Sequence, residues 1–268
     1  RLASGELIPI VPVPVLCIKS HPKVLGGIPN LVSKFGVVEV ALKITIDDIS
    51  SMSFSDNVNT LLERISFRPN NCHLIFDLKD ANFDDLDVFV DVILSYLEEF
   101  PHFTEWKTFT ICGGSFPKTG AIKQGVHQIP RNEWKFYKSI ISQLKDQQNF
   151  RHINYGDYSI IAPGHFEFDP VKMKPSANIR YTHNDIWYVI KGKALKKRAD
   201  WDQYIIQAQN IVNSNFYLNQ NFCEGDLRLF RCSIGKESKG SSQVWNWVGN
   251  NHHFTKVVND LFSNQLSS

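Results

Sequence analysis

CHLIFDL, residues 72–78, opens the stretch of sequence that decides the fold; DDLDVFVDVILSYLEEF at 84–100 and WKTFTIC at 106–112 follow it. The two short segments are almost continuously apolar, which is typical of strands in a sheet that is covered on both faces. The segment between them has apolar residues at helical spacing behind an aspartate that can act as N-cap. The order strand, helix, strand predicts a parallel pair of strands.

Similar segments lie on both sides of this unit, with roughly 30 to 45 residues from one strand to the next. The further strands are expected at LIPIVPV (7–13), VVEVALKI (37–44), FRHINYGDYSII (150–161), IWYVIKG (186–192) and DLRLFRC (226–232). The further helices are expected at FSDNVNTLLERI (54–65), RNEWKFYKSIISQLK (131–145), ADWDQYIIQAQNIVN (199–213) and HFTKVVNDLFS (253–263). The Gly- and Pro-containing segment at 114–134 is interpreted as a long functional loop.

This alternation predicts an α/β protein with a parallel sheet, and the strand spacing is that of a (β/α)₈ or TIM-barrel-like domain. We expect one domain over residues 1–268. About seven strands are recognised, so the first βα unit of the barrel is expected to be missing at a truncated N-terminus. An open, doubly wound parallel sheet is the alternative.

The amino-acid composition argues against several classes of protein. The 268 residues carry a formal net charge of +2, which argues against a surface that generally coats nucleic acid. The five cysteines show no CxxC spacing, and we interpret them as reduced residues of a cytoplasmic protein. No apolar run approaches the ~20 residues that cross a bilayer, so no membrane association is expected.

Polar residues follow the two central strands where these end, and active sites of parallel α/β proteins assemble at that edge. Asp77 could act as a general base or metal ligand with Lys79 as its electrostatic partner, or it could bind the backbone of its own loop. Gly113, Gly114 and Ser115 follow the next strand. Their successive N–H groups could bind an anion, or they could form only a tight turn.

The segment PSANIRYTH carries polar residues at every second position. If this segment is extended, Asn178, Arg180 and Thr182 point to the same face. A buried arginine there requires an anionic partner. That partner could be Asp77, Asp157 or a phosphate or carboxylate of a substrate.

The adjacent His252 and His253 stand before the last helical segment, with Asn251 as its expected N-cap. Neighbouring positions of a helix point about 100° apart, and neither HExxH nor a cysteine partner accompanies the pair. We therefore expect a structural or substrate-contacting role and no metal site. The sequence assigns no cofactor. The basic run at residues 191–198 is interpreted as a solvated loop, with a contact to nucleic acid or an acidic partner as the weaker alternative.

Five motifs, taken in order, resemble the beta protein family of phages, satellites and prophages. They are the strand-end acid in LIFDLKD, the GGSFP exit, GDY, PSANIRYT followed by IWYVIKG, and W-x-x-x-G-x-N-H-H. The family begins with an additional strand and helix, so the resemblance also implies an N-terminal truncation and a barrel-like fold. Carried over by motif, the site residues are Asp77, Lys79, Ser115, Asp157, Asn178, Arg180, Tyr181 and His252.

The resemblance implies a place among the accessory genes of mobile elements, many of which act in defence against competing phages. We expect a component of anti-phage defence that uses a protein partner from the same locus or a ligand-sensing pocket at the strand ends. The alternative is an enzyme that acts on a phosphorylated or nucleotide-like substrate and uses Asp77 and Arg180.

Overall fold

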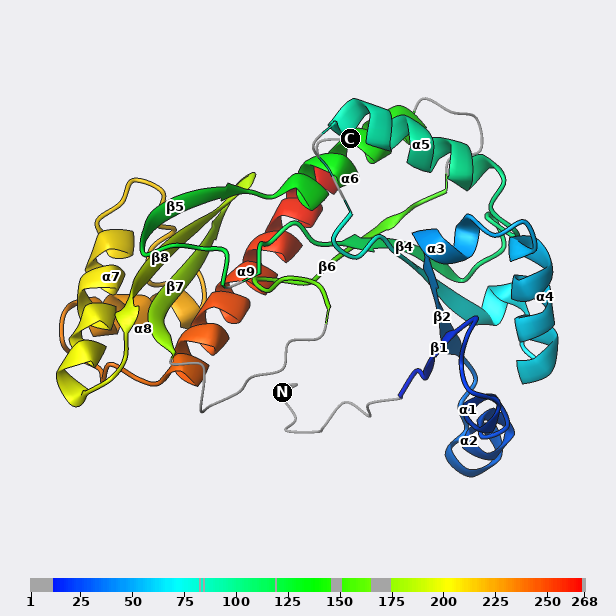
Figure 1. Ribbon diagram of the computed structural model, residues 1–268, viewed down its shortest axis with the longest axis horizontal. Helices are drawn as coiled ribbons and strands as arrows, with labels where there is room; N and C mark the ends of the chain where they lie inside the picture. The colour runs from blue at the N-terminus through cyan, green and yellow to red at the C-terminus, as the bar shows by residue number, and fades with distance from the viewer. Residues whose placement is uncertain are drawn as a thin grey trace. The chain divides into compact units, whose positions relative to one another are not determined.

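The computed structural model describes residues 12–81, 83, 85–118, 120–145, 151–164 and 175–266 (Figure 1). These residues form two compact units, and each is described by itself. Unit 1 contains the described residues up to Gly113 together with Phe136–Gly156, and unit 2 contains Gly114–Lys135 and the residues from Asp157 onward. The strand expected at 7–13 lies almost entirely outside the described residues.

Unit 1 is built around a five-stranded sheet with the order β1-β2-β3-β4-β6. Its strands are β1 (Val15–Cys17), β2 (Val40–Thr45), β3 (Cys72–Asp77), β4 (Thr108–Gly113) and β6 (Asn154–Asp157). The first four strands pair in parallel, and Thr45 lies opposite Asp77 at one end of β3. The βαβ unit predicted from the sequence is therefore confirmed.

Helices connect these strands. They are α1 (Pro22–Leu25), α2 (Ile28–Phe35), α3 (Ile46–Ile49), α4 (Phe54–Ile65), the 3-10 turn η1 (Pro69–Asn71), α5 (Leu86–Glu98) and α6 (Asn132–Lys145). Phe100, just past α5, contacts the rings of Phe54, Phe76 and Phe109 at centroid distances of 5.3, 6.0 and 5.1 Å. These contacts join two helices to two strands, which explains why the apolar residues recur at helical spacing between the strands.

The α/β class is confirmed, but the closed barrel is not seen. In the part of the chain that the structure describes, the two sheets are separate and neither closes on itself. The open-sheet alternative describes unit 1 better.

Unit 2 contains a three-stranded antiparallel sheet with the order β5-β8-β7. Its strands are β5 (Gly125–Pro130), β7 (Ser176–His183) and β8 (Ile186–Ala194), and its helices are η2 (Arg198–Asp202), α7 (Gln203–Val212), α8 (Glu224–Ser233) and α9 (Ser242–Leu266). One face of the sheet packs on α7, α8 and α9, as Figure 1 shows. The other face packs on Phe116, Ile122 and Ile160.

Three predictions of secondary structure are wrong in unit 2. The segment 226–232 is helix α8 and not a strand, because its buried residues Leu229 and Cys232 stand three apart and acidic residues occupy the first turn. Asn251 lies inside α9 and is not its N-cap. The expected loop at 114–134 contains β5.

None of the helices in the described ranges combines the length and the apolar character that spanning a bilayer requires.

Candidate functional site

Asp77 lies at the end of β3 and is 2% exposed. Its carboxylate is 3.0 Å from the ammonium of Lys43, which stands on the neighbouring strand, and it accepts a hydrogen bond of 2.9 Å from the backbone N–H of Lys79. The hydrogen bond with Asp77 raises the pKa of Lys43. The ammonium of Lys79 lies instead 3.5 Å from Asp47. The cation that faces Asp77 is therefore Lys43, and Lys79 contributes its backbone.

The glycines at the end of β4 allow close packing. A Cβ on Gly114 would lie 2.8 Å from the ring of Pro163, and one on Gly113 would touch Leu78 and Phe83 at 3.5 Å. Protein atoms thus fill the space beside both glycines, as the tight-turn alternative predicts.

Ser115 follows β4 in the chain, and its side chain contacts the first residues of helix α6. Its hydroxyl accepts a hydrogen bond of 2.9 Å from the N–H of Asn132 and donates to the carboxylate of Glu133. Its backbone N–H also donates to Glu133, at 3.3 Å. The carboxylate of Glu133 thus accepts from one of the three N–H groups that the sequence suggested for an external anion.

Glu133 begins a buried network of charges in unit 2. Its carboxylate is 3.7 Å from Nε of Arg131, whose Nη2 is 4.0 Å from the carboxylate of Asp157. Asp157 accepts a hydrogen bond of 2.8 Å from Ser159 N–H and lies 2.8 Å from Nε2 of His253. Burial raises the pKa of Glu133 to about 7, although the hydrogen bond from Ser115 acts in the opposite direction.

The two adjacent histidines of α9 have different partners, as their helical positions predicted. His253 is buried between Asp157 and the hydroxyl of Thr182, which lies 2.8 Å from Nδ1. Burial lowers the pKa of His253, and its hydrogen bond with Asp157 opposes that shift. His252 instead contacts Asp226 at 2.7 Å and the carbonyl of Thr182 at 2.8 Å.

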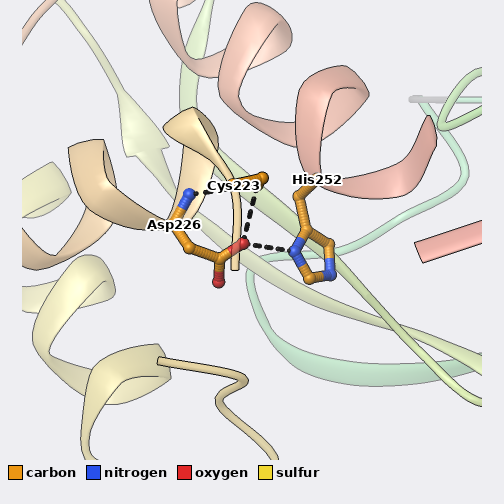
Figure 2. A group of neighbouring side chains, drawn as sticks. All are labelled: Cys223, Asp226 and His252. Atoms are coloured by element: carbon orange, nitrogen blue, oxygen red, sulfur yellow. Dashed lines mark hydrogen bonds and ion pairs between the residues drawn. The ribbon is translucent and has the colours of Figure 1, made fainter. Parts of the chain in front are cut away.

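Tyr181 belongs to this second group of side chains. Its ring stacks on His252 with a centroid distance of 3.8 Å, and its hydroxyl donates to Asp226 at 2.9 Å. The thiol of Cys223 donates to the same carboxylate, also at 2.9 Å, and Figure 2 shows the thiol and the imidazole converging on one carboxylate oxygen. Cys223, Asp226 and His252 are chemically able to hold a metal ion.

Arg180 and Asn178 lie on the face of β7 predicted from their alternation. Arg180 is 9% exposed, and its Nη1 donates to the carbonyl of Ile160 at 2.8 Å. Burial lowers the pKa of Arg180 to about 10. The side-chain oxygen of Asn178 is buried and has no hydrogen-bond partner among the described residues.

Arg180 also contributes to what we call the arginine–aromatic cluster: Arg131, Trp187, Phe116 and Arg180. The guanidinium of Arg131 lies 5.8 Å from the ring of Trp187, and that of Arg180 lies 5.1 Å from the ring of Phe116. The two rings pack edge to face at 5.1 Å. Two buried cations therefore flank one pair of aromatic rings.

The structure thus brings Ser115 and Asp157 into one charged network of unit 2, and Tyr181 and His252 into a second polar group. Asp77, Lys79 and Gly113 belong to unit 1, so the structure does not place them with Arg180 in one described site.

Several residues of these groups were not identified from the sequence. They are Lys43, Arg131, Glu133, Cys223 and Asp226. The one local signal was Cys223-x-x-Asp226, which has the spacing of a helix cap and its N3 residue.

A model of the family described as "Beta protein" matches residues 7–259 of the chain. Searches of curated proteins and of solved structures found no match.

Proposed function

Because the chain belongs to the Beta protein family, whose model matches residues 7–259, we propose that it is an accessory protein of phages and prophages that acts in anti-phage defence. In this role, unit 2 senses an anionic, phosphate-bearing small molecule at the arginine–aromatic cluster. A protein from the same mobile-element locus receives the signal.

The observation that carries the ligand proposal is a set of buried hydrogen-bond donors. Nε and Nη2 of Arg131 and Nε1 of Trp187 have no hydrogen-bond partner within the described part of the chain. The carboxylates nearest to Arg131 lie at 3.7 and 4.0 Å, beyond good hydrogen-bond distance. Because buried donors are costly to leave unsatisfied, an acceptor that enters here gains affinity, and phosphate oxygens suit a guanidinium well.

Apolar side chains cover the arginine–aromatic cluster, and this favours a ligand-sensing role over an enzymatic one. Phe116 and Ile122 are 3% and 6% exposed and pack over this face of the sheet with Ile160. A ligand that reaches the Trp187 nitrogen must displace part of this cover. Its binding is then coupled to a change of conformation, which a partner protein can recognise.

A first experiment measures ligand binding to the full chain. Inorganic phosphate, ATP and a cyclic dinucleotide are tested by thermal melting and calorimetry, with Arg180→Gln as the variant. The matched control is Arg151→Gln, since Arg151 also contacts aromatic rings and donates to backbone carbonyls, but in unit 1. A phosphate compound is expected to raise the melting temperature of the wild type and of Arg151→Gln, with at least tenfold weaker binding to Arg180→Gln.

The same variants are then compared in cells challenged with a panel of phages. Loss of protection by folded Arg180→Gln, with protection retained by Arg151→Gln, supports the proposal. The proposal is overturned if no phosphate compound binds the wild type, or if Arg180→Gln protects as well as the wild type.

A second candidate function, an enzyme acting on the same class of ligand, is favoured by Glu133. A pKa near 7 is the range in which a carboxylate serves as general base. Incubation of the full chain with the bound phosphate compound and analysis of the products tests this: turnover that Glu133→Gln abolishes supports the enzyme, and an unchanged ligand excludes it. The use of Asp77 together with Arg180 in such an enzyme stays a prediction.

A further inference from the structure

Three potential metal ligands of different chemistry meet in unit 2, away from the arginine–aromatic cluster. The thiol of Cys223, the carboxylate of Asp226 and the imidazole of His252 offer sulfur, oxygen and nitrogen atoms that all lie within 4.8 Å of one another (Figure 2). We propose that these residues bind a divalent transition-metal ion, best matched by Zn²⁺, with a fourth position for water or a substrate atom. This inference does not depend on the proposed sensing function.

Two helices position the ligands. Cys223 is the N-cap of α8 and Asp226 lies in its first turn, so the thiol and carboxylate face the same side. His252 comes from the middle of α9. Asn251 joins the two helices, because its side-chain oxygen accepts a hydrogen bond of 2.8 Å from the N–H of Gly225. The separation of the ligands is therefore set by helix packing.

The surroundings orient the ligands as in known metal sites. Nε2 of His252 lies 2.8 Å from the carbonyl of Thr182, which can only accept, so this nitrogen carries the proton and Nδ1 faces the cluster. The second carboxylate oxygen of Asp226 accepts from the hydroxyl of Tyr181. Histidine ligands commonly donate their other N–H to a backbone carbonyl, and ligating carboxylates are commonly hydrogen-bonded.

Only a small movement is needed to admit an ion. The carboxylate oxygen of Asp226 is 2.9 Å from the sulfur of Cys223 and 2.7 Å from Nδ1 of His252. Bond lengths to tetrahedral zinc place ligand atoms roughly 3.3–3.5 Å apart. The two hydrogen bonds must therefore open by less than about 1 Å, and the side chain of Cys223 is only half-buried.

Charge balance also favours the exchange of protons for metal. Without metal, the thiol holds one proton and His252 and Asp226 share another, so the group is neutral overall. A divalent ion that displaces both protons leaves a thiolate, a carboxylate and a neutral imidazole. The two negative charges balance the two positive charges of the ion, so the whole group is again neutral. A buried site therefore accepts the ion without gaining net charge.

The need for an N-cap does not by itself explain why a cysteine, Cys223, stands at the start of α8. Ser, Thr, Asp and Asn are the preferred N-cap residues because their oxygens accept strong hydrogen bonds. The cap sulfur of Cys223 accepts from the N–H of Asp226 at 3.4 Å, an ordinary distance for sulfur, but sulfur is a weaker acceptor than oxygen. A serine would cap α8 better, whereas a thiolate is the better ligand for zinc.

The test uses Co²⁺ as a spectroscopic substitute for Zn²⁺, added to the full, reduced chain. A sulfur-to-cobalt charge-transfer band in the near-ultraviolet and tetrahedral visible bands are expected, with one ion bound and Zn²⁺ displacing it. Cys223→Ser removes the ligand but keeps a good N-cap, so this variant folds. It is expected to lose the charge-transfer band and to bind the ion more than tenfold more weakly.

The matched control is Cys232→Ala, which removes a buried thiol from the other end of the same helix. This variant is expected to keep the band. Asp226→Asn, which preserves shape but weakens coordination, tests a second ligand through the same spectrum. The proposal is overturned if the wild type shows no charge-transfer band, or if Cys223→Ser shows the band of the wild type.

Discussion

Glu133 makes the stability of the protein depend on pH at the scale of one residue. Its pKa rises from an ordinary value of 4.5 to about 7 in the folded chain. Between pH 4.5 and about 7, the folded state therefore holds a proton that the unfolded state has lost. The stabilisation is present below pH 4.5 and is lost as pH rises through about 7. Each pKa unit corresponds to about 1.4 kcal/mol.

We predict that Glu133→Gln reduces this decline, because the amide is neutral at every pH and can still bond Ser115. Urea denaturation between pH 4.5 and 8 measures the unfolding free energy of the variant and the wild type. The control is Glu63→Gln, at an exposed position of α4. If the unfolding free energies of Glu133→Gln and of the wild type fall equally with rising pH, the assignment of the raised pKa to Glu133 is contradicted.

Site residues that end a strand were easier to predict from the sequence than residues whose environment depends on contacts with distant parts of the chain. Asp77 was selected because it ends an apolar strand, and it is indeed buried at that end. The environment of Glu133 depends on Arg131, Asp157 and their burial, and no local pattern encodes such non-local contacts. Arg180 could be placed on its strand face, but the aromatic ring that it contacts comes from the distant Phe116.

At the scale of elements, we predict that Asn251→Ala lowers the unfolding free energy by about 1 kcal/mol, because it removes the acceptor for the N–H of Gly225 at the start of α8. Asn251→Asp keeps an acceptor and places a negative charge at a helix N-terminus, so it is expected to be close to neutral. Urea denaturation compares the two variants. Equal losses for both would show that the amide group itself, and not the capping oxygen, is required.

The close approach of α8 to α9 yields a second prediction. A Cβ on Gly225 would lie 2.6 Å from the carbonyl oxygen of Val248, which is backbone and cannot turn away. Gly225→Ala is therefore expected to lower the unfolding free energy by about 2 kcal/mol, although alanine is intrinsically better in helices by about 1 kcal/mol. Gly120→Ala, where a Cβ meets no atom within 4 Å, is the control in the same denaturation assay. A stabilised Gly225→Ala would refute the predicted overlap.

Elements with a strong period were predictable, as was the parallel pairing of β3 with β4, but the antiparallel pairing in unit 2 was not. The periodic runs that became α4, α5, α6 and α7 had the expected type. The segment that forms α8 was expected to be a strand. Leu227 and Leu229 alternate there with charged residues, and such a pattern competes with helical spacing over so short a segment. The antiparallel pair β7 and β8 carried an unused signal: only Asn184 and Asp185 separate the two strands, which is typical of a hairpin.

At the scale of the whole molecule, the chain passes between the two units three times, after Gly113, Lys135 and Gly156. No single cut separates them. Since a single domain was expected over residues 1–268, we predict that neither fragment 1–113 nor fragment 157–268 folds alone. The first lacks β6 and the second lacks β5, each the neighbour of a strand in its own sheet. Circular dichroism and size-exclusion chromatography compare the fragments with the full chain, and a cooperative melt of either fragment would contradict this prediction.

The position of β5 has a consequence for synthesis on the ribosome. Gly125 pairs with Lys191, so β5 emerges from the exit tunnel well before the strand that it pairs with. At elongation rates of about 5–20 residues per second, β5 waits for several seconds without its partner. Its half-exposed pattern, with valine and isoleucine separated by polar residues, limits the apolar surface that the nascent chain presents during that interval.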